Sequence, residues 1–304
     1  MEWFIYAFLA PVLWALVNIT DKFLVDDNSG TDYPIGSLVI FSSVAGLVVM
    51  AVTPFITGGI FEIGFSDRLI LIASGVINLL WIIFHLHALE SDEVSSVAPW
   101  FLTIPVFAYI LGYFILGETI TGVQVFGGII ILFGNLIFSI DFKDKDNYKV
   151  KWKTVTLMLP ASILGALWGI LFKFVAQDSG FWESSFWEYA GLFLAGLFIF
   201  IFIKKYRNGF LSMLKNGGKK ILTINFSSEF VTIIGNLFNN FALLLAPVTL
   251  VYLVAAFQPV FVLIFAIILT IFIPKILTED ISKRTLIPKV IALVVMIIGS
   301  YLLL

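Results

Sequence analysis

The feature of this chain that most restricts its fold is a series of ten apolar blocks, each about as long as a lipid bilayer is thick. A transmembrane helix needs about 20 mainly apolar residues, and it must satisfy its own backbone hydrogen bonds within the hydrocarbon. The blocks are continuously apolar and do not alternate, so they indicate helices and not barrel strands. The expected helices cover residues 3–25, 34–57, 68–90, 94–117, 119–141, 154–177, 182–203, 219–245, 247–273 and 285–304.

The composition excludes a soluble globular domain. Hydrophobic residues make up 60% of the 304 residues and charged residues 12%, whereas soluble domains carry roughly 25% charged residues. The first block has no basic segment in front of it, so we expect a first membrane helix and not a cleaved signal peptide. The sequence therefore predicts an all-α integral membrane protein of about ten transmembrane helices, located in the cell membrane.

Several kinds of chemistry lack the residues that they need. The chain has no cysteine, which excludes disulfides and thiolate metal sites. Its two histidines, His85 and His87, have no further His or Cys to complete a zinc site. Phosphate-binding loops, HExxH and GxSxG are missing from the sequence. We therefore expect no metal, no cofactor and no nucleic-acid partner, and neither an ATP-driven pump nor an enzyme.

The two halves of the chain are similar to each other. LWALVNITDKFLVDD at 13–27 aligns with LGALWGILFKFVAQD at 164–178 at an offset of 151 residues, and Ala88 aligns with Ala242 at an offset of 154. GETIT after the fourth block has a counterpart in TEDIS after the ninth. Loop insertions account for the small drift in offset.

Each half holds five expected helices, and because five is odd the second half enters the membrane in the opposite sense. This pattern predicts two five-helix inverted-topology repeats, an architecture that recurs in secondary transporters. The predicted division is a first repeat at 1–141, a basic linker at 142–153 and a second repeat at 154–304.

Residues 84–138 carry a family resemblance. They read FHLHALESDEVSSVAPWFLTIPVFAYILGYFILGETITGVQVFGGIIILFGNLIF. The Ala-Leu pair, the small-residue turn, the Pro within the fourth block, the Gly-Glu pair and the Gly-bearing fifth block resemble the EamA-type members of the drug/metabolite transporter superfamily. APVLWALVNITDKF in the first block also fits. The resemblance implies a five-plus-five helix arrangement and transport of a metabolite, without naming a substrate. The second half departs from the pattern, with LTED in place of LGE.

Polar groups inside the blocks are the informative positions, because a charged residue at the bilayer centre costs about 3 kcal/mol. Glu229 lies near the middle of the eighth block, and Thr232, Asn236 and Asn240 follow at helical spacing. The carboxylate predicts proton coupling, with an interhelical hydrogen-bond anchor as the alternative. The third block presents a similar polar face, and His85 there predicts either a substrate contact or an interhelical bond.

The remaining candidates have two interpretations each. Lys22 and Lys173, at matched places, either attract an anionic substrate or extend to the lipid headgroups. Pro105 and Pro259, also matched, are expected to kink their helices as hinges or as static bends. The candidates for substrate binding or coupling are Glu229, Asn236, Asn240, Asn78, Trp81, His85, Trp14, Asn18, Asp21, Lys22, Lys173 and Gln258.

Two further acidic residues lie within or beside the apolar blocks, and Glu118 is interpreted as structural. Glu118 is expected to interact with the positive N-terminal end of the fifth helix. Glu188 lies within FWESSFWEY (181–189), a cluster typical of an aromatic belt at the membrane interface.

The function predicted from these patterns is secondary transport of a small metabolite, an amino acid or similar, by alternating access and coupled to protons through Glu229. The alternatives are a flippase for a lipid-linked or amphiphilic molecule and a non-transporting membrane scaffold. The expected partners are a small-molecule substrate and membrane lipids, and the expected state is a monomer or a homodimer.

The orientation has two conflicting indications. Most of the 18 Lys and Arg residues lie in or beside the links after the fifth, seventh and ninth helices, and positive residues in short loops favour the cytoplasm. The charge bias therefore predicts both termini outside. The family resemblance implies both termini inside.

Overall fold

The computed structural model describes residues 2–25, 35–91, 97–139, 152–216, 218–272 and 282–304, and within them the chain forms helices joined by short connections. The helices are α1 (Glu2–Val25), α2 (Ile35–Ile56), α3 (Phe65–Ser91), η1 (Ala98–Thr103), α5 (Ile104–Leu116), α6 (Gly122–Ser139), α7 (Trp152–Ser179), α8 (Phe181–Phe202), α9 (Lys204–Asn216), α10 (Gly218–Leu245), α11 (Val248–Ala255), α12 (Gln258–Phe272) and α13 (Lys283–Tyr301).

The described part contains eight helices long and apolar enough to cross a bilayer, and two shorter apolar helices at Trp100–Leu116 and Gly122–Ile137. Together they correspond to the ten apolar blocks. The prediction of an all-α, multi-pass membrane protein of about ten helices is therefore confirmed.

Two of the blocks are interrupted at their matched prolines. The fourth block consists of η1 followed by α5, and Pro105 is the second residue of α5. The ninth consists of α11 followed by α12, and Pro259 is the second residue of α12. A proline is favourable in the first turn of a helix, where its missing N–H would have no partner. Before Pro105 the 3₁₀ helix η1 continues directly into α5, whereas two turn residues separate α11 from α12 before Pro259.

The charged stretch after α8, expected to be a link, contains the short helix α9. Gly209 and Met213 are buried on its inner side, where it packs mainly on α2. A Cβ on Gly36, in the first turn of α2, would lie 2.5 Å from the Cβ of Tyr206. The missing side chain of Gly36 therefore makes room for α9.

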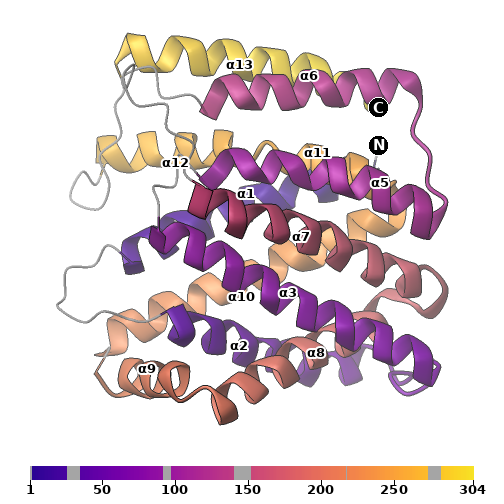
Figure 1. The fold of residues 1–304 in the computed structure, drawn as a ribbon, viewed down its shortest axis with the longest axis vertical. Helices are drawn as coiled ribbons and strands as arrows, with labels where there is room; N and C mark the ends of the chain where they lie inside the picture. The colour runs from indigo at the N-terminus through magenta and orange to yellow at the C-terminus, as the bar shows by residue number, and fades with distance from the viewer. Residues whose placement is uncertain (1, 26–34, 92–96, 140–151, 217, 273–281) are drawn as a thin grey trace.

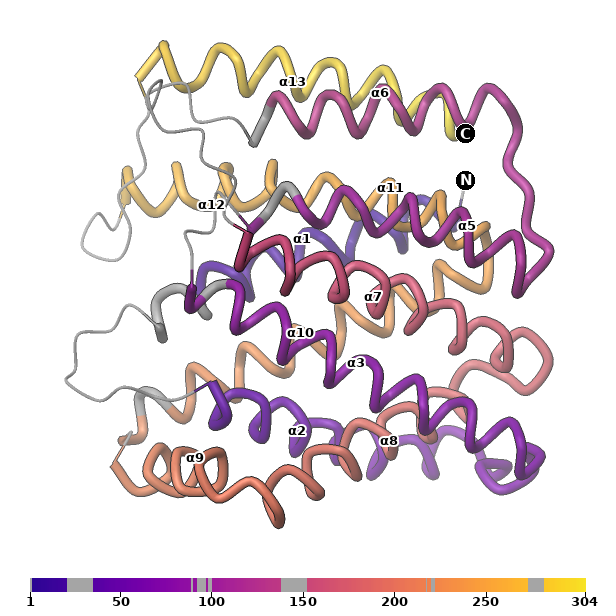
Figure 2. Tube along the Cα trace, viewed as in Figure 1, coloured from indigo at the N-terminus to yellow at the C-terminus, as the bar shows by residue number. Residues whose placement is uncertain are grey.

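The helices pair as an inverted repeat requires. α6 and α13 lie together at one edge of the bundle, and α2 and α8 lie at the opposite edge (Figure 1). Between them α1 packs along α10, and α3 packs along α7. Exchanging the two halves converts the α1–α10 pair into the α7–α3 pair and leaves the two edge pairs unchanged. Both termini lie at the same end of the bundle (Figure 2).

Two matched tryptophan–glycine contacts show the same symmetry between the halves of the chain. The offset of 151 pairs Trp14 with Gly165, and the offset of 154 pairs Trp81 with Gly235. A Cβ on Gly235 would lie 2.8 Å from Nε1 of Trp14, and a Cβ on Gly165 would lie 3.1 Å from Nε1 of Trp81. Each helix crossing thus places a tryptophan against a glycine, with the roles of the two halves reversed.

One crossing is closer than its counterpart. A Cβ on Gly75 in α3 would lie 2.5 Å from the backbone N of Leu192, and a Cβ on Gly191 in α8 would lie 2.7 Å from Cα of Ile72. The backbones of α3 and α8 are therefore in direct contact. The offset of 154 places Glu229 where Gly75 stands, and α10 makes much less contact with α2 than α3 makes with α8.

Candidate functional site

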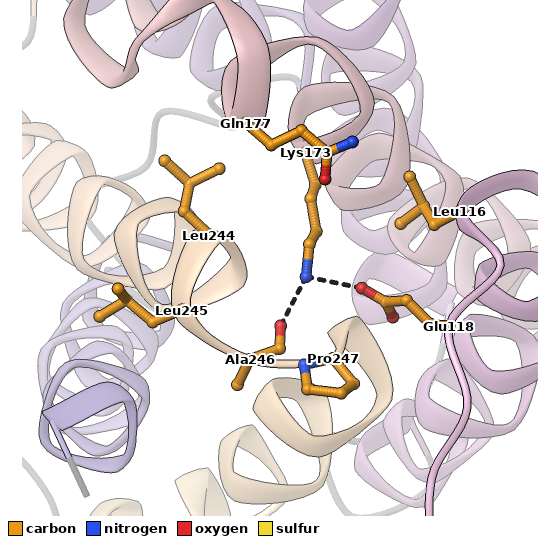
Figure 3. A pocket seen from close by; sticks show the side chains of 8 residues that line it. All are labelled: Leu116, Glu118, Lys173, Gln177, Leu244, Leu245, Ala246 and Pro247. Carbon is orange, nitrogen blue, oxygen red and sulfur yellow. Dashed lines mark hydrogen bonds and ion pairs between the residues drawn. The ribbon is translucent and has the colours of Figure 1, made fainter.

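A pocket of about 350 Å³ is lined in part by the turn between α10 and α11. That turn lies at the end of the bundle that holds the termini (Figure 2). α5, α7 and the turn between α10 and α11 form its walls (Figure 3). Its lining residues are Leu116, Glu118, Lys173, Gln177, Leu244, Leu245, Ala246 and Pro247. The pocket combines an apolar wall with one acidic and one basic group.

An ion pair crosses this pocket. Nζ of Lys173 lies 2.6 Å from Oε1 of Glu118 and donates a hydrogen bond of 2.7 Å to the carbonyl of Ala246. The other carboxylate oxygen of Glu118 accepts a 2.8 Å hydrogen bond from the N–H of Val248, the first residue of α11. The pair therefore ties α7 and the α5–α6 connection, across the repeat boundary, to the α10–α11 turn.

This geometry corrects two interpretations. Lys173 is only 8% exposed and points to Glu118, so it does not extend to the lipid headgroups. Glu118 interacts with the N-terminal end of α11 and not with that of α6. The reason is the same attraction of a carboxylate to a positive helix end, but the helix involved comes from the other half of the chain.

A second polar cluster surrounds Glu188 of α8, which is 2% exposed. Its Oε1 accepts hydrogen bonds from Nε1 of Trp168 in α7 and, at 3.5 Å, from the hydroxyl of Ser74 in α3. Its Oε2 accepts a 2.8 Å hydrogen bond from Nδ2 of Asn240 in α10. The carboxylate of Glu188 therefore lies inside the protein and joins four helices, while the aromatic belt expected around it stays a prediction.

The polar face of α10 contacts three other helices. Oδ1 of Asn236 accepts a 3.0 Å hydrogen bond from Nε1 of Trp14 in α1. Glu229 accepts a hydrogen bond from Ser42 in α2, and Asn240 reaches α8. Glu229 and Asn236 are half-buried, whereas Asn240 is fully buried. The face predicted from helical spacing thus points inward along its length.

On α3, the rings of Trp81 and His85 stack 5.3 Å apart at an angle of 12°, and the ring of Phe101 lies 5.1 Å from that of His85. Nε1 of Trp81 and Nδ1 of His85 are buried without a hydrogen-bond partner. The interhelical hydrogen bond considered for His85 is therefore not made by Nδ1. Asn78, one turn before Trp81, is 4% exposed.

The other candidates occupy separate places. Gln258 is the first residue of α12 and is half-buried, as is Asn18 in α1. Asp21 and Lys22 belong to the last turns of α1, and their side chains lie outside the described residues. Their predicted role in binding or coupling stays a prediction.

The sequence analysis missed Ser42, Ser74 and Trp168 and did not include Glu188 among the candidates for binding or coupling. Glu188 carried a usable signal, since an acidic residue within an apolar block is as costly as Glu229. The serines carried none, because small hydroxyl residues are frequent in membrane helices and pack between them in many roles.

This chain is similar to known proteins both in sequence and in fold. Residues 1–140 match the family model described as the EamA-like transporter family. A protein of Clostridium kluyveri named "Uncharacterized transporter" is 28% identical over 150 residues, which make up 48% of this chain and 46% of that protein. The aligned region thus spans less than half of the relative's length.

One solved structure shares the overall fold. A crystal structure described only as that of a protein superimposes with a TM-score of 0.61 at 14% sequence identity, over 99% of this chain and 96% of that one. The fold similarity extends through both halves, while the family match covers the first. The first 140 residues, just under half of the chain, are thus similar to the EamA-like transporter family.

Proposed function

We propose that this protein is a secondary transporter that moves a small metabolite, an amino acid or a similar compound, across the membrane by alternating access. The observation that carries the proposal is the exchange of the α1–α10 and α3–α7 pairs between two inverted halves. Two similar bundles of opposite orientation can rock against each other around a site between them, which opens first one end and then the other.

Polar groups lie where the two halves meet. The Trp14–Asn236 hydrogen bond joins α1 to α10, and the Ser42–Glu229 hydrogen bond joins α2 to α10. The stacked rings of Trp81 and His85 add two nitrogen atoms without hydrogen-bond partners. An amino acid, which carries both charges and several hydrogen-bonding groups, fits a path of this composition.

The Glu118–Lys173 pair supports the view that one end is closed in this conformation. The pair connects α7 and the α5–α6 connection to the α10–α11 turn at the end that holds the termini. Alternating access requires such a connection to form in one state and to break in the other. The pair is therefore proposed to act as a gate.

Proton coupling through Glu229 is tested in proteoliposomes that contain a pH-sensitive dye. Wild-type protein is expected to move protons when an accepted amino acid is added, and Glu229→Gln is expected to reduce this flux to the level of empty liposomes, because the amide cannot exchange a proton. Amino acids, nucleosides, sugars and cationic drugs form the panel of compounds. Glu62→Gln, which changes an exposed acidic residue, is the matched control.

Three outcomes separate the possibilities. Proton flux that persists in Glu229→Gln contradicts the role of Glu229 and leaves the transporter intact. Substrate movement without proton flux indicates uncoupled transport. Folded protein that moves none of these compounds but transfers labelled lipids between leaflets supports the flippase alternative and contradicts the proposal.

The orientation is predicted from the charge bias. The chain contains no cysteine, so single-cysteine variants can be labelled without background. The connection between α5 and α6 lies at the end that holds the termini (Figure 2). A cysteine at the exposed position Thr119 in this connection is expected to react with a membrane-impermeant maleimide on intact cells. A cysteine at the exposed position Ser212 in α9, at the opposite end, is expected to react only after lysis. Reversed labelling would establish the orientation that the family resemblance implies.

A further inference from the structure

We propose that Glu188 is a proton-binding site of this transporter, separate from Glu229, and that binding of the proton loosens α8 from α7 and α10. The inference rests on the proposed function. Under this inference, a fully buried carboxylate couples proton binding to transport and does not contact the substrate.

The first argument is the position of the carboxylate. Glu188 is 2% exposed and receives hydrogen bonds from α7, α10 and α3 through Trp168, Asn240 and Ser74. α3 belongs to the first half of the chain and the other helices belong to the second. The side chain therefore lies at the junction of the two halves, which rock relative to each other in alternating access.

The second argument is charge. Burial of an ionised carboxylate without a partner cation is costly, and in the described part of the chain Glu188 forms no ion pair. The nearest basic group along α7, Lys173, is paired with Glu118. Arg68 of α3 lies over the rings of Phe61 and Trp187, with its guanidinium carbon 5.9 and 5.3 Å from their centroids. Uptake of a proton removes the uncompensated charge.

The other titratable groups around Glu188 do not supply a counter-charge. Tyr189 of α8 and Tyr252 of α11 lie within electrostatic range of Glu188, and the Tyr252 hydroxyl donates to the carbonyl of Gly165. Glu229 of α10 also interacts electrostatically with Tyr189. α3 carries two histidines: His85, which is stacked on Trp81, and His87, whose Nδ1 lies 2.8 Å from the carbonyl oxygen of Ile83. The remaining acid of α8, Glu183, accepts a hydrogen bond from Thr57.

The third argument is that the hydrogen bonds distinguish the two protonation states. Trp168 and Asn240 donate to Glu188, as an ionised carboxylate requires. The hydroxyl of Ser74 lies 3.5 Å from Oε1 and 3.0 Å from the carbonyl of Trp168, and its one hydrogen is shared between these two acceptors. A proton on Oε2 adds a donor beside the N–H of Asn240, and rotation of the amide would present its oxygen to that donor. That rotation breaks the 3.5 Å hydrogen bond in which Nδ2 of Asn239 donates to Oδ1 of Asn240. Protonation therefore rearranges the contact between α8 and α10.

Glu188 and Glu229 lie at different depths and in different surroundings. Glu188 is seven residues after the start of α8, roughly 10 Å from the end that holds the termini. Glu229 is eleven residues after the start of α10, roughly 16 Å from the opposite end, and is half-buried. Glu229 is half-buried and accepts a hydrogen bond from Ser42, whereas Glu188 is 2% exposed.

The first test needs no substrate, because the proton itself is the ligand. Infrared spectra of reconstituted wild-type protein are recorded across a pH titration, and the carbonyl-stretching band of a buried protonated carboxylic acid is followed. The band assigned to Glu188 is expected to disappear in Glu188→Gln and to remain in Glu229→Gln. A wild-type spectrum in which no band depends on Glu188 would overturn the proposal.

The second test separates this proposal from the proposed function. With a mixture of radiolabelled amino acids as the probe, wild-type protein is expected to accumulate substrate about tenfold per unit of pH gradient for each coupled proton. Glu188→Gln is expected to keep exchange of labelled for unlabelled amino acid and to lose the accumulation. Accumulation equal to wild type would overturn the role of Glu188. Loss of exchange by wild-type protein would contradict the transporter function and leave the infrared result standing.

Glu188→Asp provides a second variant in case the glutamine variant does not fold. It keeps a titrating carboxyl group that is one methylene shorter. A shifted carboxylic-acid band with reduced accumulation supports the proposal, and an unchanged band contradicts it.

Discussion

Replacement of Gly75 by alanine is expected to separate α3 from α8 and to lower the stability of the folded protein sharply. The new Cβ would lie 2.5 Å from the backbone N of Leu192 and 3.0 Å from the backbone C of Glu188. These are backbone atoms, so no side-chain rotation relieves the clash and one helix must move. Overpacking in cores costs typically 1–3 kcal/mol, and a clash with backbone atoms places this variant at or above the upper limit.

The measurement is the midpoint of thermal unfolding in detergent, with the yield of monodisperse protein as a second readout. Gly122→Ala is the matched control, because it lies in the first turn of α6 and a Cβ there meets no atom within 4 Å. The control is expected to be as stable as wild type or slightly more stable, since alanine favours a helix by about 1 kcal/mol over glycine. Equal midpoints for Gly75→Ala and Gly122→Ala would contradict the close α3–α8 contact.

Replacement of Lys173 by methionine is expected to destabilise the protein by about 3–5 kcal/mol, the usual cost of removing one partner of a buried ion pair. The Lys173 and Glu118 side chains are only 11% and 13% exposed, so solvent screens the remaining charge poorly. Glu118 keeps its hydrogen bond to the N–H of Val248 but loses its cation. The variant is also expected to leak substrate at the end that holds the termini.

A double variant tests whether the cost comes from the uncompensated charge. Glu118→Gln in the Lys173→Met background removes the remaining charge and keeps an oxygen that accepts from Val248. In the same detergent assay, the double variant is expected to have an unfolding midpoint close to that of wild type, well above that of Lys173→Met. Lys204→Met, at an exposed position of α9, is the control and is expected to change stability by less than about 0.5 kcal/mol. Additive losses in the double variant would show that the two residues do not act as a pair.

The two variants address complementary features of the inverted repeat. Gly75 marks the crossing at which the backbones of the two halves touch, and its counterpart Glu229 marks the crossing at which a carboxylate stands between α10 and α2. If the two crossings were identical, the two conformations related by exchange of the halves would have equal energy. The α3–α8 crossing is closer than the α2–α10 crossing, so the two halves are not related by exact symmetry.

The apolar blocks, the offsets between the halves and the inward polar face of α10 were all predictable from the sequence. The physical reason is that the bilayer acts on each segment separately: every spanning segment must be apolar, about 20 residues long and helical. The matched prolines also marked where α5 and α12 begin, because proline restricts the backbone next to it.

The partners of the buried charges were decided only by tertiary structure. Glu118 and Lys173 are 55 positions apart in the sequence, and Glu188 joins Ser74, Trp168 and Asn240 from three other helices. The rotation and crossing angle of each helix select these partners, and both depend on close packing at residues such as Gly75 and Gly191. Hydropathy and helical spacing report which face of a helix is polar. They do not report which helix that face meets, since that depends on contacts between segments far apart in the chain.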